Sequence, residues 1–432
     1  MKAFICVILI VFHALPHFAQ QVDAGNGHAI ILDENGVVWT VGRNNFGQLG
    51  NGTTENSSIP IKVEGLPPIK VVSRGYDHSM ALDHEGHVWL WGCNNYGQLG
   101  TWDLNHFDKP IQLKHSKKFI AIEGGHWHSV ALADDGTVWS WGHNYFAELG
   151  NGNREHSEYP CQAELPSMNG KRTTLQNIVE IACVGYHTMA LDKHGQLFTW
   201  GANSYHELGR SKNKRETYAG LVELPKIASV AAGWHHSIAL DTKGGVWYWG
   251  KDQALKYAKR ENQEITEPIR FDNLPKIEKI ASGSWHSLAL DQDGQVWGWG
   301  RNRYGLLGTG DTVSHSKPVK MPGFENITEI GGGCFQTMAI DNSGNILTCG
   351  DNPSGQQGIN NYERLFTAEH MLLNTSGILE SPPEPQKIQD EVTPEESNSK
   401  AIVAGLKRPV YWILLISLVT NVLFIRRKLQ VK

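Results

Sequence analysis

Hydrophobic and polar residues alternate in short runs along most of this chain, and the same order of runs returns about every 50 residues. In the second copy, residues 78–83 form a short run with apolar positions on one side, and residues 87–92 alternate as a half-buried strand does. A tight turn joins them, with Gly86 where the backbone needs a positive φ. Each copy therefore predicts a β-hairpin.

Two further strands complete each copy. A glycine-rich corner follows the hairpin, then a strand led by proline (residues 60–63), and an apolar strand (residues 69–73) precedes the next copy. No segment within the copies shows the 3.6-residue period of a helical solenoid, and a parallel β-helix needs shorter coils. One four-stranded sheet cannot hide both of its faces, whereas seven sheets packed radially leave only short edges. The predicted fold class is all-β, a seven-bladed β-propeller over residues 20–374. The copies start near Gly25, Gly75, Gly125, Gly185, Gly233, Gly283 and Gly333.

Three motifs recur in register through these copies: G-x-x-H-[ST]-x-A-[LI], then G-x-V-W-x-W-G, then N-x-x-G-Q-L-G. Their combination resembles the regulator of chromosome condensation repeat over residues 22–373. The resemblance implies a seven-bladed propeller. The tryptophan-rich second motif, with GQLGNGTTENSSIP after the first hairpin, is most similar to the exported bacterial branch of that family.

The first and last predicted strands correspond to different strands of the repeat. Residues 20–24 are equivalent to the apolar strand that precedes each copy, and residues 367–373 are equivalent to the proline-led strand. We expect these two incomplete ends to lie next to each other and to close the ring.

The N-terminus differs from the repeats. Lys2 precedes an apolar run, and Pro16 and the small residue Ala19 follow it, which is the layout of a secretory signal peptide over residues 1–19. His17 stands where a small residue is preferred, and the alternative is a buried first strand.

The C-terminus predicts a membrane anchor. Residues 410–425 form an apolar stretch with basic residues on both sides, and no polar face at helical spacing supports a soluble amphipathic helix instead. We assign a transmembrane helix to residues 407–428, a short tail to residues 429–432, and a Pro/Glu-rich disordered stalk to residues 375–406. The chain is therefore expected to be exported and membrane-anchored, with the propeller on the outer (periplasmic or cell-surface) side.

Composition narrows the functional classes. Charged residues make up only 19% of the chain and the net charge is −5, so no basic excess indicates binding to nucleic acid. The cysteines include no C-x-x-C pair and do not predict a disulfide framework.

A histidine recurs in six copies, and Gln336 replaces it in the seventh without an evident compensating change. Residues one blade apart lie too far from each other to share a metal ion, so we interpret these histidines as buried groups that hydrogen-bond the backbone between blades. Paired tryptophans such as Trp89 and Trp91 are interpreted as packing between adjacent blades. No catalytic motif stands out, and we predict a non-enzyme with no cofactor and no metal site. The repeated histidines are His28, His78, His128, His187, His236 and His286.

Function is expected where the copies differ. Six of the seven copies place an aromatic residue in the two positions before the repeated histidine, at one end of the propeller. Such a rim would suit protein recognition, because Tyr and Trp anchors dominate binding energy at interfaces. The alternative is that the rings pack against neighbouring turns. These candidate binding residues are Tyr76, Trp127, Tyr186, Trp234, Trp285 and Phe335.

Three irregular segments add weaker signals. Residues 101–108 place Trp102 and Phe107 on an expected surface loop, and we add both to the candidate binding residues. Residues 167–176 form an insertion between the third and fourth copies that lacks a turn signature for a projecting hairpin. The fifth copy loses G-Q-L-G, which predicts a remodelled corner.

The function predicted is a membrane-anchored, exported propeller that binds a protein partner through one face. The similar architecture of an actinomycete inhibitor of β-lactamases, which binds its enzyme with one propeller face, implies this binding mode. The alternative implied by the resemblance is guanine-nucleotide exchange on a small GTPase, which would require a cytosolic N-terminus. A propeller-based enzyme such as a glycosidase is the third possibility.

Overall fold

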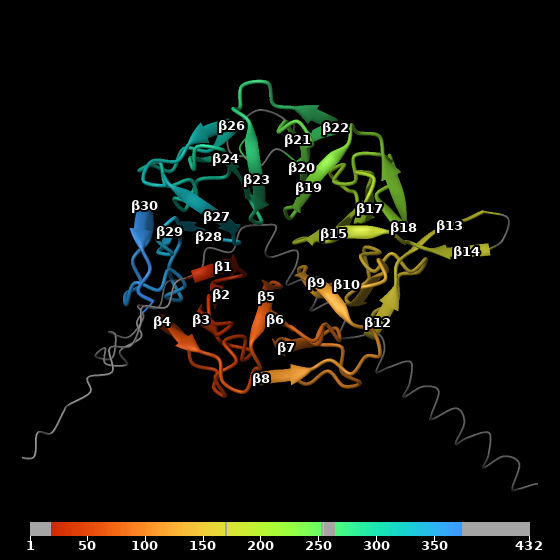
Figure 1. Cartoon of the computed structure of the whole chain (residues 1–432), viewed down its shortest axis with the longest axis horizontal. Coiled ribbons are helices and arrows are strands. Elements are labelled where there is room, and N and C mark those ends of the chain that lie inside the picture. The colour runs from red at the N-terminus through yellow and green to blue at the C-terminus, as the bar shows by residue number, and fades with distance from the viewer. Residues whose placement is uncertain (1–18, 169–170, 252–253, 255–263, 374–432) are drawn as a thin grey trace, which may run out of the picture. The chain divides into compact units, whose positions relative to one another are not determined.

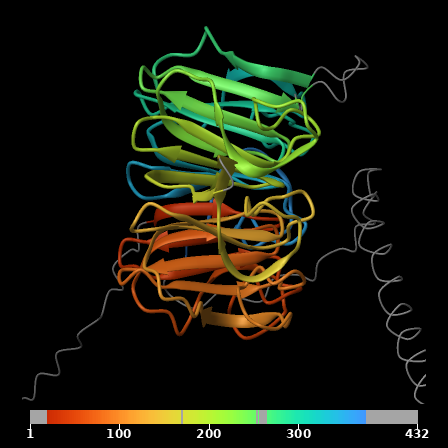
Figure 2. The same cartoon turned by 90° about the vertical axis from the view of Figure 1, so that its right-hand side faces the viewer.

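A computed structural model describes residues 19–168, 171–251, 254 and 264–373. These residues form seven four-stranded antiparallel sheets arranged radially as the blades of a propeller (Figure 1). The predicted all-β, seven-bladed architecture is confirmed. Seen from the side, the strands run between the two faces of the ring, and the connecting loops gather at those faces (Figure 2).

Each blade uses four consecutive strands, ordered from the inside of the ring to the outside. Blade 1 contains β1 (Ala19–Ala24), β2 (His28–Asp33), β3 (Val38–Gly42) and β4 (Ser57–Lys62). Blade 2 contains β5 (Ile69–Arg74), β6 (His78–Asp83), β7 (Val88–Gly92) and β8 (Phe107–Gln112). Blade 3 contains β9 (Phe119–Gly124), β10 (His128–Ala133), β11 (Val138–Gly142) and β12 (Ser157–Gln162). Blade 4 contains β15 (Ile178–Cys183), β16 (His187–Asp192), β17 (Leu197–Ala202) and β18 (Arg215–Val222).

The remaining blades repeat this order. Blade 5 contains β19 (Ile227–Ala232), β20 (His236–Asp241), β21 (Val246–Lys251) and β22 (Glu264–Arg270). Blade 6 contains β23 (Ile277–Ser282), β24 (His286–Asp291), β25 (Val296–Gly300) and β26 (His315–Lys320). Blade 7 contains β27 (Ile327–Gly332), β28 (Gln336–Asp341), β29 (Ile346–Gly350) and β30 (Leu365–His370).

The hairpin turn between the second and third strands is built as the sequence predicts. In blade 2, Gly86 has a φ of 83°, a left-handed conformation that glycine adopts without strain. One carboxylate oxygen of Asp83 accepts the backbone N–H groups of Glu85 and His87, and the other accepts the indole N–H of Trp89. The first tryptophan of the pair therefore braces its own turn.

The second tryptophan and the repeated histidine join neighbouring blades. Between blades 2 and 3, His78 Nε2 lies 3.0 Å from Ser129 Oγ, and that hydroxyl donates to the carbonyl of Gln98 at 2.7 Å. Trp141 Nε1 donates to the same carbonyl at 2.8 Å. Because the serine hydrogen is used on the carbonyl, the hydroxyl must accept from His78, so the proton of this imidazole sits on Nε2.

Five other interfaces contain the same histidine–hydroxyl pair: His28–Ser79, His128–Thr188, His187–Ser237, His236–Ser287 and His286–Thr337. The six histidines are buried, as predicted. Their partner, however, is a side-chain hydroxyl of the next blade and not the backbone. The repeated spacing in the sequence does not show which blades face each other.

The seam between blade 7 and blade 1 lacks this arrangement. Gln336 replaces the histidine, Ala29 replaces the serine, and Val41 replaces the tryptophan. Gln336 turns its amide towards Met338 Sδ at 3.2 Å. The expectation that Gln336 has no compensating change is therefore wrong, because the facing blade has lost its hydroxyl as well.

The two ends of the described chain meet at this seam but do not share a blade. Since β1–β4 and β27–β30 are each a full sheet, the expectation of two incomplete ends is wrong. The ends close the ring by packing: Ala19, Val22 and Met371 belong to one apolar cluster, with Leu373 against it. A backbone hydrogen bond from Cys334 N to Gly25 O crosses the same seam.

A separate two-stranded hairpin projects from the ring between blades 3 and 4 (Figure 1). It consists of β13 (Glu164–Met168) and β14 (Lys171–Thr174), paired antiparallel, and Leu165 packs against the adjoining core. This insertion, for which no projecting hairpin was predicted, therefore contains one. The two residues between these strands are Asn169 and Gly170, a dipeptide typical of two-residue hairpin turns, so the sequence did carry a signal for this hairpin.

The segments predicted at the two termini lie almost entirely outside the residues that the structure describes. The stalk, the anchor and the tail lie outside the described residues, as does the signal peptide except for Ala19, which is the first residue of β1. Residues 19–373, apart from the gaps given above, contain no helix long and apolar enough to cross a membrane.

Candidate functional site: the aromatic mouth of the ring

One face of the ring is formed by the loops that join the first and second strands of each blade and by the corners that join the third and fourth strands. We call it the mouth face. Backbone hydrogen bonds connect successive loops around the axis, for example Tyr76 N to Gly125 O at 3.2 Å and His126 N to Gly185 O at 3.1 Å. The loops are thus held at fixed spacing, and they present their side chains together.

Five of the predicted binding residues meet in one group of rings on this face. His126 stacks on Tyr76 at 4.0 Å and on Tyr186 at 4.8 Å between ring centroids. Trp234 of blade 5 reaches Tyr76 of blade 2 at 5.8 Å, and Trp285 lies 4.6 Å from Trp234. We call this group the mouth cluster; its members are Tyr76, His126, Trp127, Tyr186, Trp234 and Trp285.

The predicted rim residues differ in how much surface they offer. Tyr186 and Trp285 are only 9% and 5% exposed, whereas Tyr76, Trp127 and Trp234 are partly exposed. Phe335 is also partly exposed but packs against Tyr304 at 5.5 Å, separate from the cluster. Packing between turns and a presented aromatic surface therefore coexist at this mouth.

Trp102 and Phe107 lie away from the mouth cluster. Trp102 is 80% exposed and contacts Tyr159 of β12, its ring centroid 4.9 Å away. Phe107, the first residue of β8, is partly buried against the core shared by blades 2 and 3. The structure does not bring either residue into the mouth cluster.

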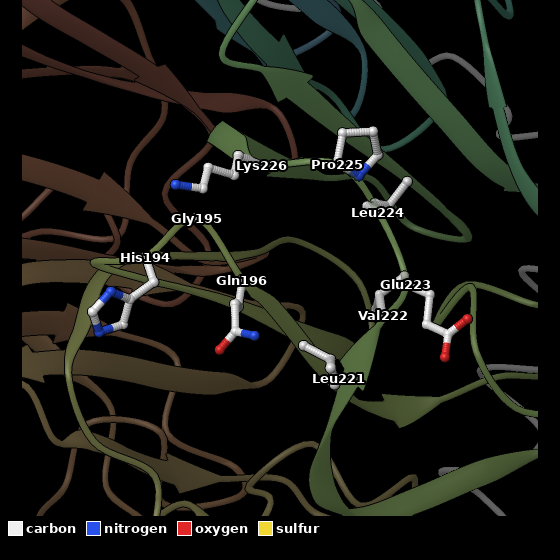
Figure 3. A pocket seen from close by; sticks show the side chains of 9 residues that line it. All are labelled: His194, Gly195, Gln196, Leu221, Val222, Glu223, Leu224, Pro225 and Lys226. Carbon is white, nitrogen blue, oxygen red and sulfur yellow. The ribbon is translucent and has the colours of Figure 1, made fainter.

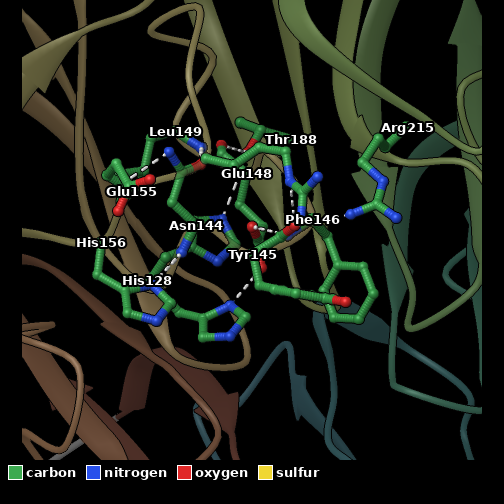
Figure 4. A network of polar contacts seen from close by, with 12 residues as sticks. His128, Asn144, Tyr145, Phe146, Glu148, Leu149, Glu155, His156, Thr188 and Arg215 are labelled. Atoms are coloured by element: carbon green, nitrogen blue, oxygen red, sulfur yellow. Dashed lines mark hydrogen bonds and ion pairs between the residues drawn. The ribbon is translucent and has the colours of Figure 1, made fainter. Parts of the chain in front are cut away.

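Sequence reasoning missed the acidic and histidine residues beneath the rings. Glu148 is fully buried: its Oε1 lies 2.6 Å from His143 Nδ1, and its Oε2 accepts the N–H of Phe146 (Figure 4). Glu207 repeats the pattern one blade on, with Oε1 3.2 Å from His235 Nδ1. The signal was available, because copies three and four read E-L-G where the first two copies read Q-L-G.

Burial keeps the cluster uncharged near neutral pH. Burial, helped by the neighbouring His143, lowers the pKa of His126 well below its usual range. Burial also raises the pKa of Tyr76 and of Tyr186 well above the usual range. The cluster is therefore a neutral aromatic surface, suited to apolar and stacking contacts.

Charged groups also lie on the inner wall of the ring. Arg74, at the end of β5, lies 3.2 Å from a carboxylate oxygen of Asp23 and donates to Gly332 O. Burial and the charge of Asp23 raise the pKa of Glu123 to about 8, against the opposing effect of Arg74. Glu123 is thus largely protonated at neutral pH.

Two other features of the described residues are weaker candidates. Asp83, Glu85 and His87 could share a cation, but Asp83 is committed to its hairpin turn and Lys118 Nζ lies 2.7 Å from His87 Nε2, which opposes a cation there. A shallow pocket of about 570 Å³ lies on the opposite face of blade 4 (Figure 3). It is lined by His194, Gly195, Gln196 and residues 221–226, with no converging set of polar groups.

Comparisons with known proteins agree on the repeat type. The family described as RCC1-like domain matches residues 10–276 and 113–407. A curated relative, the RCC1 domain-containing protein RUG3, mitochondrial, of Arabidopsis thaliana, is 56% identical over 36 residues. That match spans 8% of this chain and 8% of the relative's length.

Solved structures with the same fold cover most of the chain. Human WBSCR16 aligns with a TM-score of 0.65 at 24% identity, over 74% of this chain and 85% of its own. Prp20p of Saccharomyces cerevisiae aligns with a TM-score of 0.68 at 23% identity, over 81% of this chain and 88% of its own. Yeast RCC1 (Prp20) bound to Kap60 gives 0.66 at 24% identity, over 78% and 83%. At these identities the similarity establishes the fold.

Proposed function

The chain belongs to the RCC1-like domain family, and from this premise we propose that it is a protein-interaction module that binds its partner with the mouth face. The observation that carries the proposal is the mouth cluster, in which six rings from five blades meet and three of them remain partly exposed. Aromatic anchors surrounded by well-packed neighbours are typical of binding hot spots.

Two features support this surface over others. The rings are positioned by backbone hydrogen bonds between loops, so little side-chain freedom would be lost on binding. Among the similar structures, yeast RCC1 (Prp20) is described bound to Kap60, and Prp20p is described with binding properties to Gsp1p and histones. Those partners belong to those proteins, and they support a protein as the class of partner here. The net charge of −5 does not favour nucleic acid.

The test compares the full-length protein with three variants. Trp127→Ala and Trp234→Ala remove partly exposed rings of the mouth cluster, and Trp102→Ala removes an exposed ring elsewhere as a matched control. Partners captured by the unmodified protein should be lost with the first two variants and kept with Trp102→Ala. Thermal unfolding of each variant verifies that it folds. An identical partner list for all proteins would reject the mouth face as the binding surface.

A second function, nucleotide exchange on a small GTPase, is favoured by one observation. The hairpin β13–β14 projects from the ring between blades 3 and 4. A projecting hairpin could act as a wedge. The test is release of a fluorescent guanine nucleotide from small GTPases, with the unmodified protein and with residues 164–174 replaced by a short glycine-serine linker. Equal release rates with and without the hairpin would reject exchange through this element.

We also propose that the protein is exported and held at the membrane by residues 407–428, in a non-enzymatic role. The apolar stretch with flanking basic residues and the signal-like N-terminus support this. N-terminal sequencing of the mature protein and protease accessibility of the propeller in intact cells test it. An uncleaved N-terminus with a protected propeller would contradict export.

A further inference from the structure

Two arginines from adjacent blades converge on one tyrosine at the mouth face, at the corner between blades 3 and 4. Arg154 Nε and Arg215 Nη1 each donate to the backbone carbonyl of Tyr145 at 3.1 Å (Figure 4). The guanidinium carbons also lie 5.0 and 5.4 Å from the centroid of the Tyr145 ring. Each guanidinium is therefore held by a hydrogen bond and a cation–π contact to the same residue.

Both members of this pair are positively charged, and neither forms a close ion pair with a described residue. Among the described residues, neither Arg154 nor Arg215 has a carboxylate within 4.0 Å, although other arginines of the same face do. Arg364, for example, stacks on Tyr304 and pairs with Asp351 at 2.9 Å. Two like charges are thus fixed close together without a direct ion pair, an arrangement that a bound anion would relieve.

The pair is also extended by the loop that carries Arg215. Lys212 and Lys214 are exposed on that loop, and neither has an ion pair with a described residue. Each arginine uses one nitrogen on the tyrosine carbonyl, so its other N–H groups remain available. A carboxylate has two oxygens and one charge, which a single arginine can satisfy. Two converging guanidiniums suit a group with more oxygens and up to two charges.

We propose that Arg154 and Arg215 form a binding site for a tetrahedral oxyanion, the phosphate or sulfate ester group of a ligand or partner. Tyr145 positions both guanidiniums, and Lys212 and Lys214 raise the local concentration of anions. The site lies on the mouth face but does not depend on the mouth cluster, so it stands or falls independently of the protein-binding proposal.

The test measures binding of small anions to the full-length protein at constant ionic strength. Inorganic phosphate and sulfate are titrated by calorimetry and by thermal unfolding, with acetate as the carboxylate control. An anion that binds only the folded state raises the unfolding temperature in a concentration-dependent way. We expect a rise with phosphate or sulfate and none with acetate. Tighter binding of phosphate supports a phosphate ester as the ligand, tighter binding of sulfate supports a sulfate ester, and binding of neither overturns the proposal.

Variants assign the binding to the pair. Arg215→Gln should weaken binding by about 10-fold or more, since a charged hydrogen bond is lost. Arg215→Lys should weaken it nearly as much, because an ammonium group cannot donate in a planar fork to the carbonyl and the anion together. Lys212→Gln is the matched control and should have a small effect. Equal losses for Lys212→Gln and Arg215→Gln would reduce the site to non-specific attraction and overturn the proposal.

Discussion

The seam between blades 7 and 1 can be rebuilt with two substitutions. Gln336→His and Ala29→Ser would introduce the histidine–hydroxyl pair that the six other interfaces contain. The new serine would face the carbonyl of Gln356, the counterpart of Gln98, because Gly42 of blade 1 already contacts Gln356 closely. The perturbation therefore adds one pair at the place where the fold omits it.

The expected magnitude follows from the existing pairs. A buried intramolecular hydrogen bond contributes about 1 kcal/mol net, whereas a buried polar group without a partner costs about 1–3 kcal/mol. Gln336→His alone and Ala29→Ser alone each bury an incompletely satisfied polar group, so each should destabilise the protein. Together they should satisfy each other, and the coupling energy should be about 1–3 kcal/mol in favour of the double variant.

The assay is urea unfolding of the unmodified protein, both single variants and the double variant, analysed as a double-mutant cycle. The control makes the reverse change. His78→Gln with Ser129→Ala removes the histidine–hydroxyl pair between blades 2 and 3 and gives that interface the residues found between blades 7 and 1. That pair should show a coupling of the same sign and similar size. Additive effects within about 0.3 kcal/mol at both interfaces would refute the assigned role of the histidine–hydroxyl pair.

Three further predictions concern titration, thiol reactivity and the hairpin turn. Burial lowers the pKa of His28, His78, His236 and His286 to about 3 and that of His128 and His187 to about 4, from an ordinary 6.5. The unfolded chain therefore binds more protons below pH 6.5, and each histidine should reduce stability by up to about 1.4 kcal/mol per pH unit on acidification from pH 6.5 towards 4; a urea midpoint that is flat between pH 7 and 5 would contradict this. Burial raises the pKa of Cys93 and Cys349 to about 12 and that of Cys334 to about 11, so among the described cysteines the half-buried Cys161 should react first with a thiol reagent, and uniform rates for these cysteines would argue against the fold described. Asp83→Asn should cost about 1–2 kcal/mol in urea unfolding, because Asp83 accepts from two backbone N–H groups and an indole, while the exposed Asp134→Asn should change nothing measurable.

The repeat itself could be predicted from the sequence because its signals are local. Turn glycines such as Gly86 and the alternation in residues 87–92 depend on neighbours a few positions away. The hairpin β13–β14 was missed although Asn169-Gly170, a dipeptide typical of two-residue hairpin turns, lies between its strands. The role of Gln336 escaped because its partner, Ala29, lies at the other end of the chain and meets it only when the ring closes.

The mouth cluster was only partly predictable for the same reason. The sequence treats the aromatic residues before each histidine as equivalent, but they occupy two positions. Tyr76 and Trp234 stand two residues before the histidine and meet across the ring. Of the residues directly before the histidine position, Phe335 turns to Tyr304, whereas the others join the cluster: Trp127, Tyr186 and Trp285. The repeat marks the two positions where Glu148 and Glu207 replace a glutamine, but it does not show that they are buried, because a carboxylate in a corner loop is usually solvated.

The use of four consecutive strands in every blade has a consequence for how the chain may be rearranged. In many closed rings one blade contains strands from both ends of the chain, so the two ends hold the ring closed. Here the described ends, Ala19 and Leu373, merely adjoin one apolar cluster. A circular permutation could join them by a linker and begin the polypeptide at Ile227 instead. The chain would then be interrupted between blades 4 and 5, where the His187–Ser237 pair is complete. The seam between blades 7 and 1, which lacks such a pair, would be joined by continuous backbone. The same ring of seven blades should therefore form when the chain starts at a different blade.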